Sequence, residues 1–221
     1  MIYYVFLLKL IVSSLMVKKI IIFSFIYLVS CSNNNSIKLQ NENVQNLQKN
    51  DPSQNILNIK MSVKKFLNWY KINFNEIHKI ELLNTGNKYG KFDSTIYYSV
   101  NFENVEKYLQ KFKTGGFVSN NYIIHWRQYF RESDKHLKDN PQNDGIPDDF
   151  NFDFVTWSQE YEDALNQIDN IKFINLEIKD HKAEVVIQFY PKVYPDYKLQ
   201  FYLTNQNGYW LIDSIQNIIK E

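Results

Sequence analysis

The amino-acid sequence predicts an α+β domain in which N-terminal helices pack on a C-terminal, curved, antiparallel four-strand meander in a cone-like arrangement. Two observations support this fold class. Between residues 56 and 137, apolar side chains recur at intervals of three and four, the repeat of one helix face. Between residues 171 and 218 the apolar repeat falls to two, as in a half-buried strand. Helices followed by a run of neighbouring strands are typical of the α+β class.

The first predicted helix begins near Ile56, shortly after Pro52 and Ser53, which are residues typical of a helix N-terminus. Its apolar face consists of Ile56, Ile59, Val63, Phe66, Leu67, Tyr70, Phe74 and Ile77. The segment 81–95 follows this helix and contains two glycines and an Asn-Gly-Asn run. Because such residues favour turns, we expect a loop there.

Two further helices are predicted before the strands. The second covers about residues 101–113, because Gly115 and Gly116 can end it. Its inward residues are Phe102, Val105, Tyr108, Leu109 and Phe112. Ser119 can cap the third helix, which continues to about Leu137. Its inward residues are Tyr122, Ile123, Trp126 and Phe130.

The remainder of the chain is predicted to form an irregular segment, a short helix and four strands. Residues 140–153 contain prolines and a glycine, and a short helix is expected near residues 157–168. The four strands are expected at residues 171–179, 183–190, 199–203 and 209–218. The sequence Asn205-Gln206-Asn207-Gly208 is typical of a hairpin turn between the last two strands.

Composition excludes nucleic acid as a partner. The chain holds 25 basic and 24 acidic residues, and its first 30 residues contain three lysines and no acid, which leaves 22 bases and 24 acids. A chain of this charge lacks the basic field that nucleic-acid binding requires. Cys31 is the only cysteine, so no disulfide is expected within the chain.

The N-terminal residues follow the order of a secretory signal. Two lysines precede the apolar run 20–29, and a small serine stands directly before Cys31. We therefore interpret residues 1–30 as a signal peptide; a start at Met16 would leave a short basic segment before the same run. The alternative is an uncleaved membrane anchor, although the run is shorter than the about 20 apolar residues that a membrane span needs.

The residues Leu28-Val29-Ser30-Cys31 resemble the lipobox of bacterial lipoproteins. The resemblance implies that Cys31 receives a diacylglyceryl thioether and that the chain is cleaved before it. Membrane lipid would then be a partner, and the bacterial cell envelope the location. No acidic residue lies between Cys31 and Glu42, as in lipoproteins sorted to the outer membrane, where the domain would face the periplasm of a Gram-negative host.

A tether is predicted between the lipidated residue and the folded domain. Residues 31–55 are rich in amides and poor in aromatics, so they cannot bury enough apolar surface to offset the entropy of ordering. As a flexible coil this segment would span roughly 25 to 30 Å. Residues 56–221 then form a single α+β domain.

The domain itself has a second resemblance. Val63, Phe66, Trp69 and Tyr70 on the first helix, together with Gly208-Tyr209-Trp210-Leu211-Ile212-Asp213-Ser214-Ile215 at the end, resemble an uncharacterised domain family of bacterial lipoproteins. That family is related to the nuclear-transport-factor-like or cystatin-like cone of helices over a curved sheet. The resemblance implies a pocket between sheet and helices, and it implies no activity and no catalytic residues.

The segment 140–153 holds the densest group of oxygen donors. Donors at 140, 142, 144, 148 and 151, with a glycine after the third, are typical of a calcium loop. We name Asp144, Asp148 and Asp149 as candidate calcium ligands, and no other cofactor is expected. Positions 140 and 151 are amides where carboxylates are usual. The alternative is a solvated turn stiffened by two prolines.

Five residues are candidates for ligand binding: His125, Trp126, Trp157, Tyr161 and Tyr197. His125 places a titratable group beside an aromatic residue. Tyr197 belongs to an aromatic rim that could stack on a sugar or a peptide. That rim consists of Tyr190, Tyr194, Tyr197 and Tyr202. The alternative is that these aromatic residues belong to the core.

The sequence contains neither G-x-S-x-G nor H-E-x-x-H, so no catalytic residue is predicted. We expect a lipid-anchored, non-catalytic domain that binds a small molecule, a peptide or a protein. One alternative is an immunity protein that inhibits a cell-wall-degrading enzyme by placing the segment 140–153 in its cleft. A second alternative is an envelope hydrolase that uses His125 or Asp213 as a base.

Overall fold

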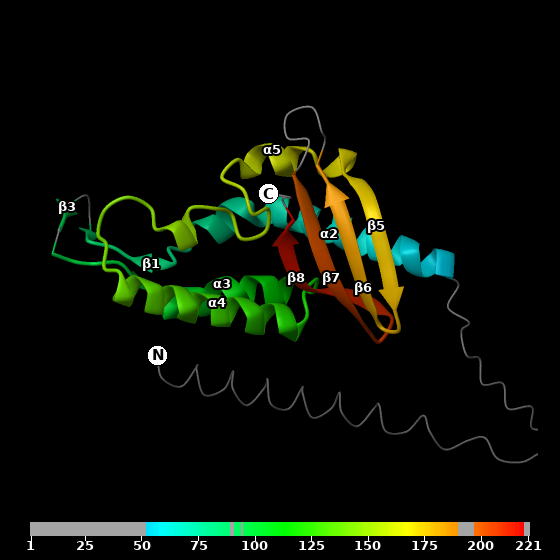
Figure 1. The fold of residues 1–221 in the computed structure, drawn as a ribbon, viewed down its shortest axis with the longest axis horizontal. Coiled ribbons are helices and arrows are strands. Elements are labelled where there is room, and N and C mark those ends of the chain that lie inside the picture. Colours follow the sequence, from blue (N-terminus) through cyan, green and yellow to red (C-terminus); the bar gives the residue numbers. More distant parts are fainter. Residues whose placement is uncertain (1–51, 89–90, 94, 190–196, 219–221) are drawn as a thin grey trace, which may run out of the picture. The chain divides into compact units, whose positions relative to one another are not determined.

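The computed structural model describes residues 52–88, 91–93, 95–189 and 197–218, which belong to one compact unit, Gln48–Glu221 (Figure 1). Several predictions concern residues outside this described part. They are the signal peptide 1–30, the lipidated Cys31, the tether up to residue 51, and the rim residues Tyr190 and Tyr194. The last part of the predicted tether, residues 52–55, is helical, because the first described helix already begins at Pro52.

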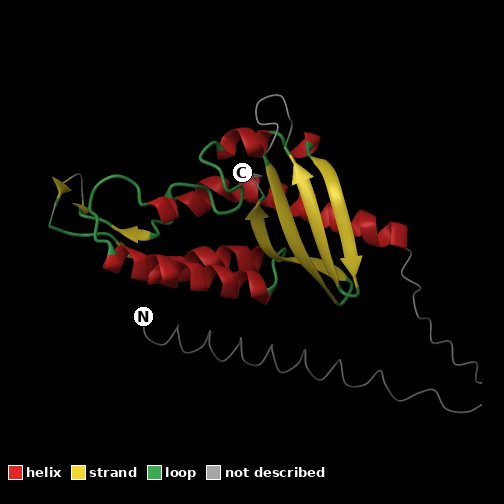
Figure 2. Ribbon diagram, viewed as in Figure 1, coloured by secondary structure: helices red, strands yellow, loops and turns green. Residues whose placement is uncertain are grey.

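The described chain has the predicted order of helices first and a four-stranded antiparallel sheet last, so the α+β class is confirmed (Figure 2). The helices are α2 (Pro52–His78), α3 (Phe102–Gly115), α4 (Asn120–Asp139) and α5 (Tyr161–Asn166), with short 3-10 helices at Asp148–Phe150 and Ile168–Asn170. The sheet consists of β5 (Lys172–Lys179), β6 (Lys182–Gln188), β7 (Lys198–Gln206) and β8 (Tyr209–Asn217).

Helix α2 follows its apolar spacing closely. Its buried residues are Ile59, Val63, Phe66, Leu67, Tyr70 and Ile77. Two residues of the predicted face differ. Ile56 is exposed, because the first turns of α2 extend past the sheet (Figure 1), and Phe74 is only partly buried. Phe74 instead takes part in the aromatic contacts of the candidate site described below.

Helices α3 and α4 have the predicted termini. The Asn101 side chain accepts a hydrogen bond from the Asn104 backbone N–H at 3.1 Å, and Gly116 ends α3 in the left-handed conformation with φ 76°. Ser119 caps α4 by accepting from the Asn121 N–H at 3.0 Å. Phe102 was predicted to point inward, but it is exposed because it is the first residue of α3.

The predicted loop 81–95 was wrong in part. Two short antiparallel pairs lie in this region: β1 (Leu83–Asn84) with β4 (Ser99–Val100), and β2 (Asn87–Lys88) with β3 (Lys91–Phe92). Strands of two residues are too short to show an alternating pattern, so the sequence could not reveal them.

The sheet has the order β5-β6-β7-β8, with each strand antiparallel to the next. On β6, Ala183, Val185 and Ile187 are buried, which confirms the predicted period of two. Val185 pairs with Phe201 on β7, and Phe201 pairs with Ile215 on β8, so these buried residues form one continuous row across the sheet.

The core lies where α2, α3 and α4 meet the buried face of the sheet. The Phe66 ring of α2 lies 6.4 Å from Phe112 of α3 and 6.5 Å from both Tyr122 of α4 and Phe201 of β7, measured between ring centroids. Full burial of one such ring contributes about 1.5 to 3 kcal/mol to stability. A parallel bridge between Val118 and Ile212 joins the start of α4 to β8.

Candidate functional site

A buried carboxylate joins the C-terminal end of α2 to the loop before α5. Asp153 Oδ2 accepts a hydrogen bond from the Tyr70 hydroxyl and lies 3.0 Å from His78 Nε2. Asp153 Oδ1 accepts from the backbone N–H groups of Val155 at 3.2 Å and Thr156 at 2.6 Å. An aspartate that accepts from N–H groups two and three residues later folds its own loop into a turn. Asp153 therefore fixes both the loop and the two side chains.

The hydrogen bonds assign a tautomer to His78. His78 Nε2 lies 2.9 Å from the Tyr70 hydroxyl and 3.0 Å from Asp153 Oδ2. Since the hydroxyl donates to Asp153 and an ionised carboxylate only accepts, the contact between Nε2 and Asp153 needs a proton on Nε2. In the neutral ring, Nδ1 is then a hydrogen-bond acceptor. It has no hydrogen-bond partner among the described residues, because both hydrogen-bond contacts of the ring are made by Nε2. Burial, reinforced by the Asp153 charge, raises the pKa of the Tyr70 hydroxyl, which therefore stays a donor. His78 is the member of the group that reaches solvent, with 36% of its side chain exposed.

An aromatic stack holds the imidazole of His78 in place. Phe74 lies one turn before His78 on α2, and the two rings stack with centroids 3.8 Å apart. Phe74 also contacts Tyr161 of α5, at 4.5 Å, and Tyr70, at 5.7 Å, between ring centroids. Because residues four apart share a helix face, the spacing of Tyr70, Phe74 and His78 places all three toward the same loop.

A cavity of about 440 Å³ lies beside His78. It is lined by Ile77, His78, Ile80, Glu81, Leu82, Leu83, Thr85, Tyr108, Ile146, Phe150, Phe152 and Phe154. Most of these side chains are apolar, and the imidazole of His78 and the carboxylate of Glu81 supply hydrogen-bond acceptors. The cavity can therefore hold an apolar ligand whose hydrogen-bond donor meets the imidazole.

The five predicted ligand-binding residues do not converge on this cavity. Trp126 is fully buried and belongs to the core. His125 lies beside it on the exposed side of α4, with ring centroids 5.5 Å apart. Trp157 donates from Nε1 to the Ile215 carbonyl at 3.1 Å, and Tyr197 donates to the Thr156 carbonyl, so both stabilise the loop that carries Asp153. Of the five, Tyr161 lies nearest the site.

Tyr161 contacts the site through its ring, whose centroid lies 5.5 Å from that of His78. The remaining rim residue of the described chain, Tyr202, lies on β7 with its hydroxyl 3.5 Å from Gln216 Oε1 on β8.

The segment 140–153 is irregular, as predicted, but its aspartates do not gather around one point. Within the described residues, no group of three or more His, Cys, Asp or Glu side chains is placed to hold a metal ion. Asp144 and Asp148 are exposed, and Asp149 Oδ2 lies 3.0 Å from His136 Nδ1. Ile146, in the middle of the segment, is 72% exposed and lines the cavity beside His78.

Asp213 was one candidate base, and the structure places it in a different environment. Its carboxylate accepts hydrogen bonds from the hydroxyls of Ser119 and Thr204, and from Asn121 Nδ2 at 3.3 Å. These donors come from the start of α4 and from β7. Asp213 therefore connects the first turn of α4 to the sheet, and its lone pairs are already engaged.

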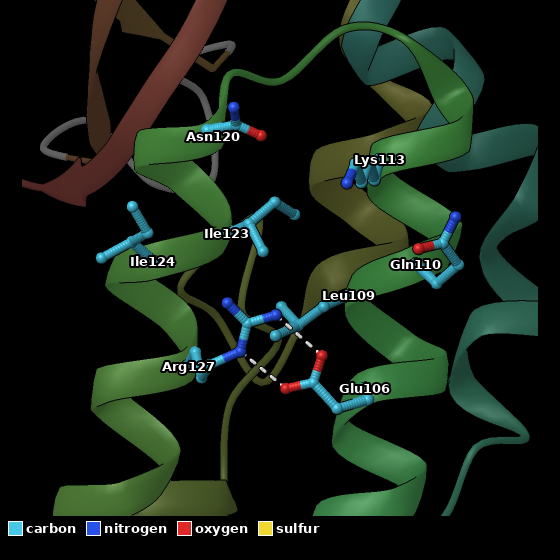
Figure 3. Close-up of a pocket in the computed structure, with 8 residues that line it drawn as sticks. All are labelled: Glu106, Leu109, Gln110, Lys113, Asn120, Ile123, Ile124 and Arg127. Atoms are coloured by element: carbon cyan, nitrogen blue, oxygen red, sulfur yellow. Dashed lines mark hydrogen bonds and ion pairs between the residues drawn. The ribbon is translucent and has the colours of Figure 1, made fainter.

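A groove of about 280 Å³ lies between α3 and α4 (Figure 3). Arg127 reaches across it from α4 and donates two hydrogen bonds to Glu106 of α3, at 2.6 and 2.7 Å. This bidentate geometry lowers the pKa of the Glu106 carboxyl. Arg127 and Glu106 therefore pair with each other and join the helices. Lys113 is the remaining charged residue of the lining, and the groove is smaller than the cavity beside His78.

The sequence pattern did not reveal the pairing of His78 with Asp153. The two residues are 75 positions apart, and neither belongs to a recognised motif. The available signal was the spacing of Tyr70, Phe74 and His78 along one helix face, of which only Tyr70 and Phe74 belong to the predicted apolar face.

Neither a protein-family model, a curated protein nor a solved structure matches this chain. Among the described residues, none of the helices is both long enough and apolar enough to cross a membrane.

Proposed function

We propose that this chain is a lipid-anchored bacterial envelope protein whose α+β domain binds a ligand in the cavity beside His78. The observation that carries the binding function is the imidazole of His78, fixed by Asp153 at the wall of an apolar cavity. The anchor is supported by the sequence around Cys31. The order of helices followed by a meander supports a relationship to the nuclear-transport-factor-like or cystatin-like cone.

The lining of the cavity favours a ligand with an apolar body and an amine. Aromatic and aliphatic side chains cover most of the wall. The free acceptor of His78 and the carboxylate of Glu81 both favour a hydrogen-bond donor, and Glu81 also favours a positive charge. A carboxylate ligand would meet like charge at Glu81.

Binding can be tested with two probes that share an apolar body, 4-phenylbutylamine and 4-phenylbutyrate. The full chain is titrated with each probe by calorimetry, together with His78→Phe and a control, His181→Phe, in an exposed turn. We expect the amine to bind more tightly than the carboxylate, and His78→Phe to weaken amine binding about fivefold, the value of one hydrogen bond of about 1 kcal/mol. Equal binding of both probes, or an unchanged affinity in His78→Phe, would contradict the proposed site.

Anchoring is tested separately. Cells that produce the full chain are labelled with an alkyne analogue of palmitate, and Cys31→Ala is compared with the natural sequence. We expect the label on the natural chain and none on Cys31→Ala, because Cys31 is the only thiol. Equal labelling of both chains would remove the lipoprotein assignment without affecting the cavity.

One observation favours a second candidate function, hydrolysis. In the pair of His78 and Asp153, the carboxylate orients the ring so that Nδ1 could take a proton from water and return it to a leaving group. The base would then be His78 rather than His125 or Asp213. Hydrolysis of p-nitrophenyl butyrate by the full chain tests this candidate. Activity that His78→Gln abolishes and His181→Gln retains would support it, and the same rate in all three chains would contradict it.

A further inference from the structure

A second cavity, with different chemistry, lies between α2 and the hairpin of β7 and β8. Its volume is about 710 Å³. It is lined by Asn58, Met61, Ser62 and Lys65 of α2, by Gly116 and Phe117 before α4, and by the hairpin residues Gln206, Asn207, Gly208, Tyr209, Trp210 and Leu211. It shares no residue with the cavity beside His78. The two can therefore be tested independently.

The charge of this cavity comes from a single group. Lys65 is its one charged lining residue, and the lining contains no aspartate or glutamate. Lys65 is exposed and forms no ion pair with any residue of the described chain. A single unpaired ammonium among neutral groups favours one negative charge on a ligand, whereas a nucleic acid requires a row of cations.

The remaining polar groups suit a ligand that carries many hydroxyls. Gln206 and Asn207 are exposed at the hairpin, and Ser62 lines the same cavity from α2. Amides and hydroxyls both donate and accept, which is the requirement for binding sugar hydroxyls and acetamido groups.

The aromatic ring of Tyr209 and the backbone of Gly116 and Gly208 also line this cavity. Tyr209 is 73% exposed, so its ring is available for stacking. Gly116 and Gly208 have φ of 76° and 86°, and a Cβ at either position would meet no atom within 4 Å. The backbone is therefore open to close approach at two points of the cavity.

From this combination we propose that the cavity between α2 and the hairpin binds an acidic saccharide. One pyranose ring stacks on Tyr209, its hydroxyl and acetamido groups bond to Gln206, Asn207 and Ser62, and its carboxylate lies at Lys65. Aromatic stacking alone would accept a neutral sugar equally well. Lys65 favours an acidic saccharide over a neutral one, because its ammonium group attracts the carboxylate.

The experiment compares two disaccharides of similar shape. N-acetylglucosaminyl-N-acetylmuramic acid carries one carboxylate, and N,N′-diacetylchitobiose carries none. Each is titrated into the full chain by calorimetry. We expect the acidic disaccharide to bind about fivefold more tightly, the difference that one exposed ion pair can supply.

Variants separate the contribution of the Lys65 charge from that of stacking on Tyr209. Lys65→Gln should reduce affinity for the acidic disaccharide about fivefold and leave chitobiose unchanged, while the control Lys71→Gln, exposed on the same helix outside the cavity, should change neither. Tyr209→Ala should weaken both about tenfold, whereas the exposed Tyr97→Ala should not. Absence of saturable binding, equal binding of the two sugars, or equal effects of Lys65→Gln and Lys71→Gln would each overturn the proposal.

Discussion

Replacement of Asp153 by alanine should remove a large part of the stability of the domain. The substitution leaves the backbone N–H groups of Val155 and Thr156 without their acceptor, and it leaves the Tyr70 hydroxyl with His78 Nε2 as its partner at 2.9 Å; Tyr70, Val155 and Thr156 are all buried. Each buried group that loses its partner costs about 1 to 3 kcal/mol. Allowing for partial relaxation of the loop, we expect a loss of about 3 to 6 kcal/mol, against a total stability of about 5 to 15 kcal/mol for a typical domain.

Urea denaturation followed by tryptophan fluorescence measures this loss. Asp153→Asn is the informative companion, because it retains one oxygen for the N–H groups of Val155 and Thr156. It should cost only about 1 to 2 kcal/mol. Asp144→Ala, at an exposed position of the same irregular segment, is the control and should change stability by less than about 0.5 kcal/mol. A loss below about 1 kcal/mol in Asp153→Ala would refute the assigned role of this carboxylate.

Three further outcomes are expected. Partial burial lowers the pKa of His125, so the unfolded chain takes up the proton first, and stability falls as the pH drops through the ordinary histidine value of about 6.5. His125→Gln should make the urea midpoint less dependent on pH between about pH 7 and 5, whereas His181→Gln should leave that dependence unchanged. Asp213→Ala should cost about 1 to 3 kcal/mol in urea unfolding, because the hydroxyls bonded to it lose their acceptor. Gly116→Ala should lower stability by about 1 kcal/mol in the same assay, because φ there is 76°; an unchanged midpoint would contradict that backbone strain.

The sequence was most informative where structure depends on neighbours along the chain. The cap at Ser119 was readable because its side chain bonds to a backbone group two residues away. The hairpin turn at Asn207 and Gly208 was readable because both residues adopt positive φ, as such a turn requires. Periodicity likewise gave the buried faces of α2, α3 and α4, with errors at the first turns, where solvent replaces the packed neighbour.

By itself, then, the sequence determined the order of elements and most of the buried faces of α2, α3 and α4. It missed the start of α2, at Pro52 rather than Ile56, and the bounds of α5, which spans Tyr161–Asn166 rather than 157–168. It also placed one cysteine after an apolar leader, which remains the basis of the predicted lipid anchor.

Only the tertiary structure brought His78 to Asp153, surrounded the Asp213 carboxylate with donors from α4 and β7, and left the predicted ligand-binding residues outside the lining of the cavity beside His78. The physical reason is the distance along the chain over which each kind of contact acts. Helix faces and turns arise from contacts within a few residues and leave a periodic trace, whereas polar groups that meet across the fold leave none.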